Sequence, residues 1–186
     1  MPEDIVVHAF DEVEKDLVEV VCAEVELSFK MEVTRGEKLS VPALSYSRER
    51  NQYLSTDLLG VLAIRRHGDK CIRLGITNVD LFVPELNFVF GEASSARRVA
   101  VFSTARLDPR IYGEPKDEAI FLRRATTEAV HELGHVFGLS HCTRTGCVMW
   151  FSNTLSETDR KGSRFCQRCA AKLDRTDSLV NSASSE

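Results

Sequence analysis

The first third of the chain alternates between apolar and polar residues in a pattern typical of a strand, a helix and a second strand. Residues 4–10 are rich in β-branched side chains and predict a buried strand. Residues 11–24 place apolar side chains at helical spacing, and they open with two acids that suit the positive end of a helix dipole. Residues 27–33 alternate with period two, as a strand does. Together they predict a right-handed β–α–β unit.

The pattern beyond residue 46 predicts two helices and further strands. Residues 47–66 carry leucines and valines on one helical face, and residues 117–137 form a long helix that stops at Gly138. Three strands are predicted between these helices, at residues 71–81, 87–90 and 98–104. Past Gly138 we expect cysteine-rich irregular structure, and from residue 174 a frayed, Ser-rich tail.

The length, amino-acid composition and net charge of the chain indicate which broad class of protein it belongs to. With 186 residues, 43% hydrophobic and 28% charged, the chain suits one folded domain with a sizeable core. A net charge of −4 provides no global basic surface, so no nucleic-acid partner is expected. The longest apolar run, residues 58–64, is too short to cross a membrane, and the acidic N-terminus does not resemble a secretory signal. We therefore expect a cytoplasmic monomer.

Three histidines lie at the spacing of a zinc site in the segment AVHELGHVFGLSHCTRTGCVM, which spans residues 129–149. His131 and His135 are four residues apart, so both imidazoles project from one face of a helix. Gly138 can adopt a positive φ, end the helix and turn His141 back toward the same point. Three imidazoles leave a fourth position for water, which is the open geometry of a catalytic zinc site.

Glu132 follows the first histidine and is rotated around the helix from it. Its carboxylate can reach a water on the metal without being a ligand, which suits a general base. The alternative is a surface helix that carries His and Glu by chance, and the fixed offsets of Gly138 and His141 make that alternative rare. The other histidines, His8 and His67, are interpreted as a core or surface side chain and a solvated helix end.

Four cysteines follow the histidines in two close pairs, a pattern that suits a tetrahedral Cys₄ zinc site. They are Cys142, Cys147, Cys166 and Cys169. The basic residues around the second pair, Lys161 among them, can offset the negative charge of four thiolates. The alternatives are a redox CxxC, two disulfides or a nucleic-acid patch. A redox CxxC is expected to open a helix in a β–α–β unit, whereas this pair lies in the last fifth of the chain. Cys22 and Cys71 are interpreted as small buried hydrophobes.

The segment HELGHVFGLSHC followed by CVM resembles the metzincin clan of zinc endopeptidases, with Met149 as the Met-turn residue. The appended cysteines are similar to those of the archaemetzincin family within that clan, and the similarity covers residues 130–169. The resemblance implies a catalytic zinc on three histidines, a general base and a structural zinc on four cysteines. These residues are His131, His135 and His141, then Glu132, then Cys142, Cys147, Cys166 and Cys169.

The resemblance also implies the fold class, α/β (α+β). It is a compact metzincin-like single domain with a twisted mixed sheet of four to five strands, an active-site helix and a cleft between upper and lower halves. Residues 1–173 would form the catalytic domain, with an upper part at 1–138 and an irregular zinc-bound lobe at 139–173. Residues 174–186 would be a flexible tail. No tyrosine follows His141, so the metal-coordinating tyrosine of some metzincins is absent.

These parts predict a zinc metallopeptidase with two Zn²⁺ ions, in which a zinc-activated water attacks a peptide carbonyl and Glu132 moves the proton. We expect a peptide or unfolded protein as substrate, paired with an edge strand at residues 87–92. One alternative is a non-catalytic zinc module that binds a protein or nucleic acid through its basic cysteine lobe. Another is a latent enzyme, because Cys142 directly follows His141. Glu132 favours catalysis, since a binding module does not need this carboxylate.

Overall fold

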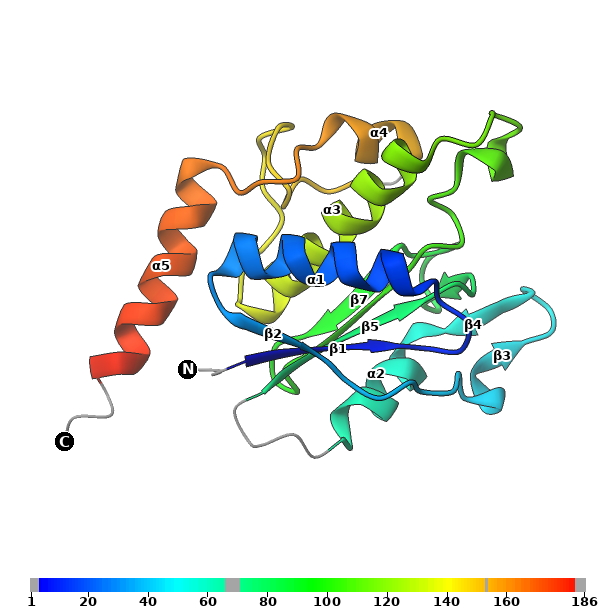
Figure 1. Ribbon diagram of the computed structural model, residues 1–186, viewed down its shortest axis with the longest axis horizontal. Coiled ribbons are helices and arrows are strands. Elements are labelled where there is room, and N and C mark those ends of the chain that lie inside the picture. Colours follow the sequence, from blue (N-terminus) through cyan, green and yellow to red (C-terminus); the bar gives the residue numbers. More distant parts are fainter. Residues whose placement is uncertain (1–3, 66–70, 153, 183–186) are drawn as a thin grey trace.

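A five-stranded mixed sheet forms the centre of the molecule (Figure 1). The computed structural model describes residues 4–65, 71–152 and 154–182. The strands, in spatial order, are β2 (Glu32–Arg35), β1 (Asp4–Ala9), β5 (Ile72–Thr77), β8 (Val99–Ser103) and β7 (Gly91–Ser94). The first four run parallel and β7 runs antiparallel to β8. β7 therefore lies at an edge of the sheet.

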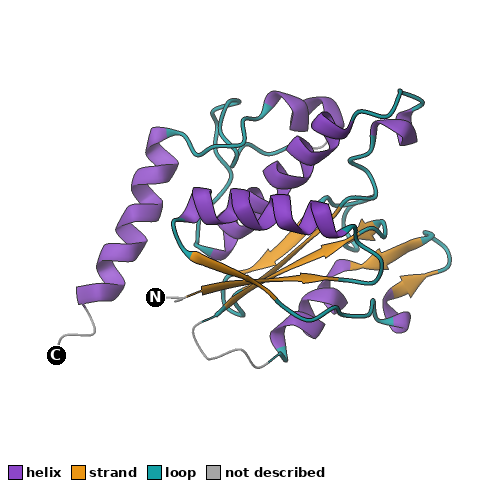
Figure 2. Ribbon diagram, in the orientation of Figure 1, coloured by secondary structure: helices purple, strands orange, loops and turns teal. Residues whose placement is uncertain are grey.

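Helices cover both faces of this sheet (Figure 2). The helices α1 (Lys15–Phe29) and α3 (Glu118–Val136) pack on one face, and α2 (Ser55–Ala63) packs on the other. Alternate residues of β8 enter the two cores, as strand geometry requires. Phe102 joins the core under α1 and α3, whereas Val101 joins the core under α2.

Smaller elements complete the chain. A second sheet contains β3 (Tyr46–Ser47), β4 (Gln52–Leu54) and β6 (Leu81–Phe82), and two short 3₁₀ helices lie at Ala43–Ser45 and Pro109–Tyr112. At the C-terminal end, α4 (Leu155–Arg160) and α5 (Gln167–Ser182) follow the histidine and cysteine segment. No helix in the described part of the chain is long and apolar enough to cross a membrane.

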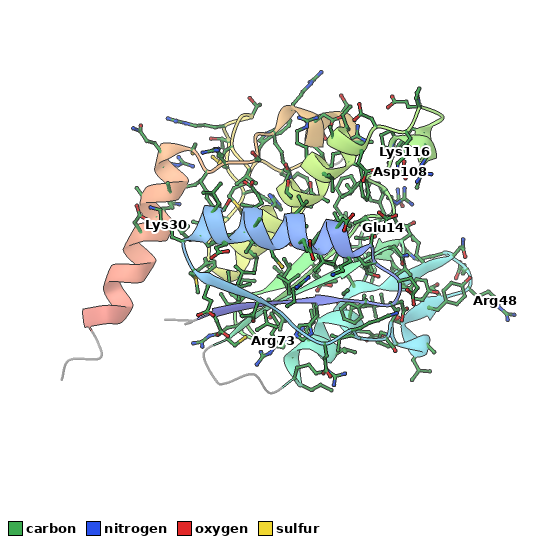
Figure 3. The ribbon with its side chains drawn as sticks, viewed as in Figure 1. Glu14, Lys30, Arg48, Arg73, Asp108 and Lys116 are labelled. Carbon is green, nitrogen blue, oxygen red and sulfur yellow. The ribbon has the colours of Figure 1, made fainter. Side chains whose placement is uncertain are left out.

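Charged side chains spread over the outer surface (Figure 3). Glu14, Asp108 and Lys116 lie near one end of α1, where they line a cavity of about 240 Å³ that is distinct from the one described below. Arg48 projects from the turn between β3 and β4.

The predicted strand β1, the strands β5 and β8, and the long helix α3 are confirmed. The predicted β–α–β start is confirmed as a parallel β1–β2 pair joined by α1, but its boundaries were wrong. The helix begins at Lys15, because Asp11 adopts a left-handed φ of 51° that ends the preceding strand. The helix also runs on to Phe29, so the strand predicted at residues 27–33 lies instead at Glu32–Arg35.

Two further predictions were wrong. Residues 47–54 form part of a β-hairpin rather than a helix, since Asn51 turns the chain with a φ of 53° and Tyr46 pairs with Tyr53. Residues 87–90 make only an isolated bridge, between Val89 and Leu81, and the strand follows at Gly91. The last part of the helix predicted at 47–66, and His67, fall outside the described residues.

The C-terminal segment is more regular than expected. The lobe predicted to be irregular contains α4 and the start of α5, and the predicted frayed tail is helical as far as Ser182. Thr154 begins α4 with a capping box in which Glu157 takes part.

Arg124 precedes the histidines on α3 and is buried rather than solvated. Its side chain is 4% exposed and its guanidinium contacts both carboxylate oxygens of Asp159 at 2.8 and 2.7 Å, while another nitrogen donates to the carbonyl of Leu107 at 2.8 Å. Arg123 also contacts Asp159, but it is 49% exposed. These contacts hold α4 against α3.

We expect Arg124→Met to lower the free energy of unfolding by about 1–3 kcal/mol, because it removes charged hydrogen bonds and leaves the Leu107 carbonyl unsatisfied. Arg123→Met is the matched control and should cost about 0–1 kcal/mol, as exposed ion pairs do. Denaturant unfolding of both variants tests this. Equal losses would show that Arg124 does not anchor α4.

Candidate metal centre

The helix α3 carries two of the three histidines on its buried face. Asp117 caps its first turn by accepting from the backbone N–H of Ile120 at 2.9 Å. The helix ends after Val136, where Gly138 adopts a φ of +82°. A positive φ is accessible to glycine at little cost, so the chain turns here as the sequence indicated. This turn brings His141 back toward His131 and His135, which we call, together, the histidine cluster.

Backbone carbonyls hold the two helical imidazoles. His131 Nδ1 lies 2.7 Å from the carbonyl of Val148, and His135 Nδ1 lies 2.8 Å from that of Leu139. A carbonyl oxygen only accepts hydrogen bonds, so each Nδ1 carries the proton and donates it. In the neutral rings both Nε2 atoms are then bare acceptors. Burial lowers the pKa of both histidines, which favours these neutral rings at pH 7.

These two Nε2 atoms face each other at 3.2 Å. Two lone pairs repel at that distance unless a cation lies between them. Two ligands at about 2.0–2.1 Å from a tetrahedral zinc are about 3.3–3.4 Å apart, which is close to the observed separation. Each of the three histidines offers one ring nitrogen, and these three nitrogens all lie within 4.8 Å of one another. The histidine cluster therefore fits a zinc ion.

His141 is the exposed member of the histidine cluster. Its ring stacks 5.5 Å from that of His131 and lies 4.6 Å from that of Phe151, measured between centroids. Burial lowers the pKa of His141 as well, with His135 and Lys161 adding to the effect. All three histidines that the sequence singled out are thus brought together.

Glu132 lies beside this cluster and is 5% exposed. Burial, with a contribution from Glu128, raises the pKa of its carboxyl to about 8. A bound divalent cation opposes that shift, because it favours the carboxylate. Gly91 of β7 leaves room for this side chain: a Cβ at position 91 would lie 2.6 Å from Glu132 Cγ. Glu132 is therefore confined between α3 and the edge strand.

The four cysteines also converge, and we call them the cysteine cluster: Cys142, Cys147, Cys166 and Cys169. All are free thiols, and Cys142 Sγ lies 3.8 Å from Cys166 Sγ. Sulfur ligands at about 2.3 Å from a tetrahedral zinc are separated by about 3.8 Å. Cys166 does directly precede a helix, α5, but that helix belongs to no β–α–β unit, and its sulfur lies among the other three. The cysteine cluster fits zinc better than a redox pair.

Backbone amides point at the sulfurs. The N–H of Cys166 donates to Cys147 Sγ at 3.3 Å, and the N–H of Arg144 donates to Cys142 Sγ at 3.5 Å. A hydrogen bond from the backbone of Cys169 lowers the pKa of Cys166 to about 6, while burial raises the pKa values of Cys147 and Cys169. Only some of the thiols ionise readily without a cation, so a metal ion is needed to hold four thiolates.

The two clusters share backbone. Cys142 directly follows His141, and Cys147 directly precedes Val148, whose carbonyl holds His131. The N–H of Cys142 donates to the carbonyl of Met149 at 2.8 Å, which closes this segment on itself. The positions of the sulfurs therefore constrain both His141 and the carbonyl that orients His131.

Met149 lies beneath the histidine helix and is fully buried. Gly134 makes this possible, since a Cβ there would overlap Met149 Sδ and lie 3.3 Å from Phe165. The sequence did not single out Gly134, although it stands inside the histidine motif.

A cavity of about 400 Å³ opens over the histidine cluster and Glu132. Residues 86–93, which include the start of β7, form one wall, and Phe151 and Ser152 contribute to another. Residues 87–92, predicted as an edge strand, thus lie along the cleft, with the regular strand starting at Gly91. The side chain of Glu92 bonds to the hydroxyls of Ser55 and Thr56 at the start of α2.

Sequence reasoning missed one ion pair in this cavity. Lys161 was grouped with the basic residues around the cysteines, but its side chain is 1% exposed and its Nζ lies 2.9 Å from Oε1 of Glu128, which is 2% exposed. Both residues line the cavity. The only available signal was the position of Glu128, three residues before His131 on the same helix.

Comparison with known proteins gives one consistent family. The sequence matches peptidase family M54 over residues 3–175. It is 41% identical to an archaemetzincin of Pyrococcus furiosus over 181 residues, which is 94% of each chain. The fold is similar to the crystal structure of an archaemetzincin from Methanopyrus kandleri, with a TM-score of 0.83, 38% identity and coverage of 94% of this chain and 95% of that one. A zinc-dependent peptidase from Methanocorpusculum labreanum gives a TM-score of 0.82 at 30% identity, covering 91% and 99%.

We expect Gly134→Ala to lower the free energy of unfolding by about 1–3 kcal/mol, because the added methyl group displaces Met149 from a packed core. Gly146→Ala is the matched control. It lies in the cysteine segment with open space around its Cβ, so it should change stability by no more than about 0.5 kcal/mol. Thermal unfolding of both variants measures the difference. A neutral Gly134→Ala would mean that Met149 repacks freely.

Proposed function

Because the chain belongs to peptidase family M54, the archaemetzincins, and is a zinc metallopeptidase, we propose that Glu132 is the general base of its peptide hydrolysis. The observation that carries this proposal is the confinement of the Glu132 carboxyl beside the three histidines, in the same cavity. A carboxylate so close to a metal site, yet outside the ligand set, suits proton transfer.

The histidine cluster is the proposed site of the catalytic zinc. Its ligand atoms would be Nε2 of His131 and His135, which the carbonyls of Val148 and Leu139 leave unprotonated, and a ring nitrogen of His141. When bound, zinc supplies the Lewis acidity that makes water a nucleophile at neutral pH and that stabilises charge on a carbonyl oxygen.

Glu132 then moves the proton. Its carboxylate accepts a proton from the attacking water and returns it to the amine that leaves. Burial between α3 and Gly91 keeps the carboxylate in one position, so the transfer needs little reorganisation.

The substrate is proposed to be a peptide or an unfolded protein segment held along β7. This strand has a free edge, because it is the last in the order β2-β1-β5-β8-β7, and residues 86–93 line the cleft. An extended peptide can add to such an edge through main-chain hydrogen bonds. The exposed side chains of Leu86 and Phe151 at the cleft provide apolar contact for its side chains.

The cysteine cluster is proposed to hold a second, structural zinc. The segment from Gly138 to Cys169 buries few large apolar side chains, mainly Leu139, Val148 and Met149. Ordering the backbone of this segment costs ~1–2 kcal/mol for each of its roughly thirty residues. A structural zinc can contribute about 10–16 kcal/mol in favourable peptides, so a metal clip fits the need.

We expect Glu132→Ala to keep its zinc but to lose hydrolysis by at least ~10²-fold, which is the lower range for loss of a general base. Zinc content and kcat/KM on a peptide library measure the two properties separately. Glu49→Gln, an exposed carboxylate in the β3–β4 hairpin, is the control and should match the wild type. Wild-type rates in Glu132→Ala would mean that another group is the base, and loss of zinc would make Glu132 a ligand.

A separate prediction concerns the shared backbone of the two clusters. Wild-type protein should carry two zinc equivalents, and Cys166→Ser should weaken zinc binding at the histidine cluster although it alters none of the histidines. The reason is that a disordered cysteine cluster releases the backbone beside His141 and Val148. Competition with a chelator of known affinity measures the change.

Cys22→Ser is the matched control, because Cys22 is a half-buried thiol on α1 far along the chain from either cluster. It should leave both zinc affinities unchanged. If Cys166→Ser left the histidine site as tight as in the wild type, the two sites would be independent.

A further inference from the structure

One pair of charged side chains in the cleft takes no part in the steps above. Lys161 and Glu128 line the cavity together with the histidine cluster and Glu132. Their side chains are 1% and 2% exposed, and Nζ lies 2.9 Å from Oε1. Within the described lining of that cavity, Lys161 is the only lysine or arginine. A buried ammonium therefore borders the space that a substrate would occupy.

Attachment of α4 to α3 does not account for this pair. Asp159, two residues before Lys161, already contacts Arg123 at 3.0 Å and Arg124 at 2.7 Å. Burial of two charges also removes hydration that a single ion pair often fails to replace, so such pairs are weak sources of stability. The position of the pair in the cleft is what needs a reason.

The Lys161 ammonium has more N–H donors than its pairing with Glu128 uses. Lys161 carries three N–H groups, and its Nζ forms an ion pair with Oε1 of Glu128. The hydroxyl of Thr158 lies 3.5 Å from that same oxygen. Glu128 is the one side chain of the described residues that pairs with Lys161, so further donors are left for a group in the cleft. A carboxylate satisfies a buried ammonium better than a neutral acceptor does.

The pair also lies close to the reacting centre. Glu128 stands three residues before His131 and four before Glu132 on α3, so the three share one side of the helix. Lys161 and Glu128 line the same cavity as His131, His135 and His141. A group bound by Lys161 would therefore lie near the bond to be cleaved.

We propose that Lys161 is a specificity-determining residue that binds a carboxylate of the substrate near the scissile bond, and that Glu128 is a positioning residue that holds the ammonium in place. This inference rests on the proposed hydrolysis of peptides. The carboxylate belongs to an Asp or Glu side chain or to the free C-terminus of a short peptide, and the two sources have the same chemistry.

The test compares two matched pairs of peptides. One pair has both ends blocked and carries Glu or Gln beside the scissile bond, and the other has neutral side chains and a free or amidated C-terminus. The zinc-loaded enzyme should prefer the carboxylate member of one pair by about 10- to 100-fold in kcat/KM, the range for a charge-assisted hydrogen bond. The pair that shows the preference identifies the source. Equal constants within both pairs would overturn the proposal.

Variants assign the preference to Lys161. Lys161→Met combined with Glu128→Gln removes both charges, so that neither is left buried alone, and the ratio of the two constants should fall to near 1. Lys161→Arg keeps the charge and should keep most of the preference. Lys116→Met removes a lysine that is 66% exposed and outside this cleft, and should leave the ratio unchanged. A preference that survives in the double variant would contradict the assignment.

A binding measurement separates this proposal from the proposed hydrolysis. Calorimetry with the Glu132→Ala protein needs no turnover, and it should show about 10- to 100-fold tighter binding of the carboxylate peptides. Loss of that difference on adding Lys161→Met and Glu128→Gln would support recognition even if no peptide were cleaved. If wild-type protein cleaved the peptides while Glu132→Ala bound both members of each pair alike, hydrolysis would stand and the role of Lys161 would not.

Discussion

The hydrogen bonds from His131 and His135 to two backbone carbonyls are the constraint on which the rest of the site depends. Each bond places the ring proton on Nδ1 and leaves a bare Nε2, and the two Nε2 atoms then face each other at 3.2 Å. A zinc ion between these two atoms would remove the repulsion of their lone pairs. Both carbonyls, of Leu139 and Val148, belong to the segment that follows α3. The helix supplies two of the three candidate ligands, and the segment after it supplies the third and sets which ring nitrogens of the first two carry the proton.

That segment buries few large apolar side chains of its own, and we propose that the cysteine cluster orders it. Two of the four cysteines are sequence neighbours of residues that build the histidine cluster, Cys142 beside His141 and Cys147 beside Val148. A change in the cysteine cluster therefore moves a ligand and a carbonyl together. We therefore propose that the two clusters fold as one unit, and that the histidine cluster keeps its geometry only when the cysteine cluster is ordered.

The sequence predicted which side chains come together at the site better than it predicted their surroundings. The spacing of the residues from His131 to His141, and that of the four cysteines, limits which atoms can meet. The three histidines come together in one cluster and the four cysteines in another, as predicted. The pairing of Lys161 with Glu128 joins residues far apart in the chain, and no local pattern encodes it. The hairpin at residues 46–54 was mistaken for a helix because its one leucine, Leu54, continues the apolar face of α2. The left-handed φ of Asn51 is the feature that marks the turn. The helical C-terminus was missed because its composition is polar.

The most direct test of this account is a cobalt(II) titration of metal-free protein followed by visible absorption. Thiolate-to-cobalt charge transfer reports the cysteine cluster, and weaker bands of a nitrogen-ligated ion report the histidine cluster. The account predicts that the charge-transfer band saturates first, with one equivalent, and that the nitrogen-site bands develop only afterwards. Filling of the histidine cluster while the cysteine cluster is still empty would contradict it.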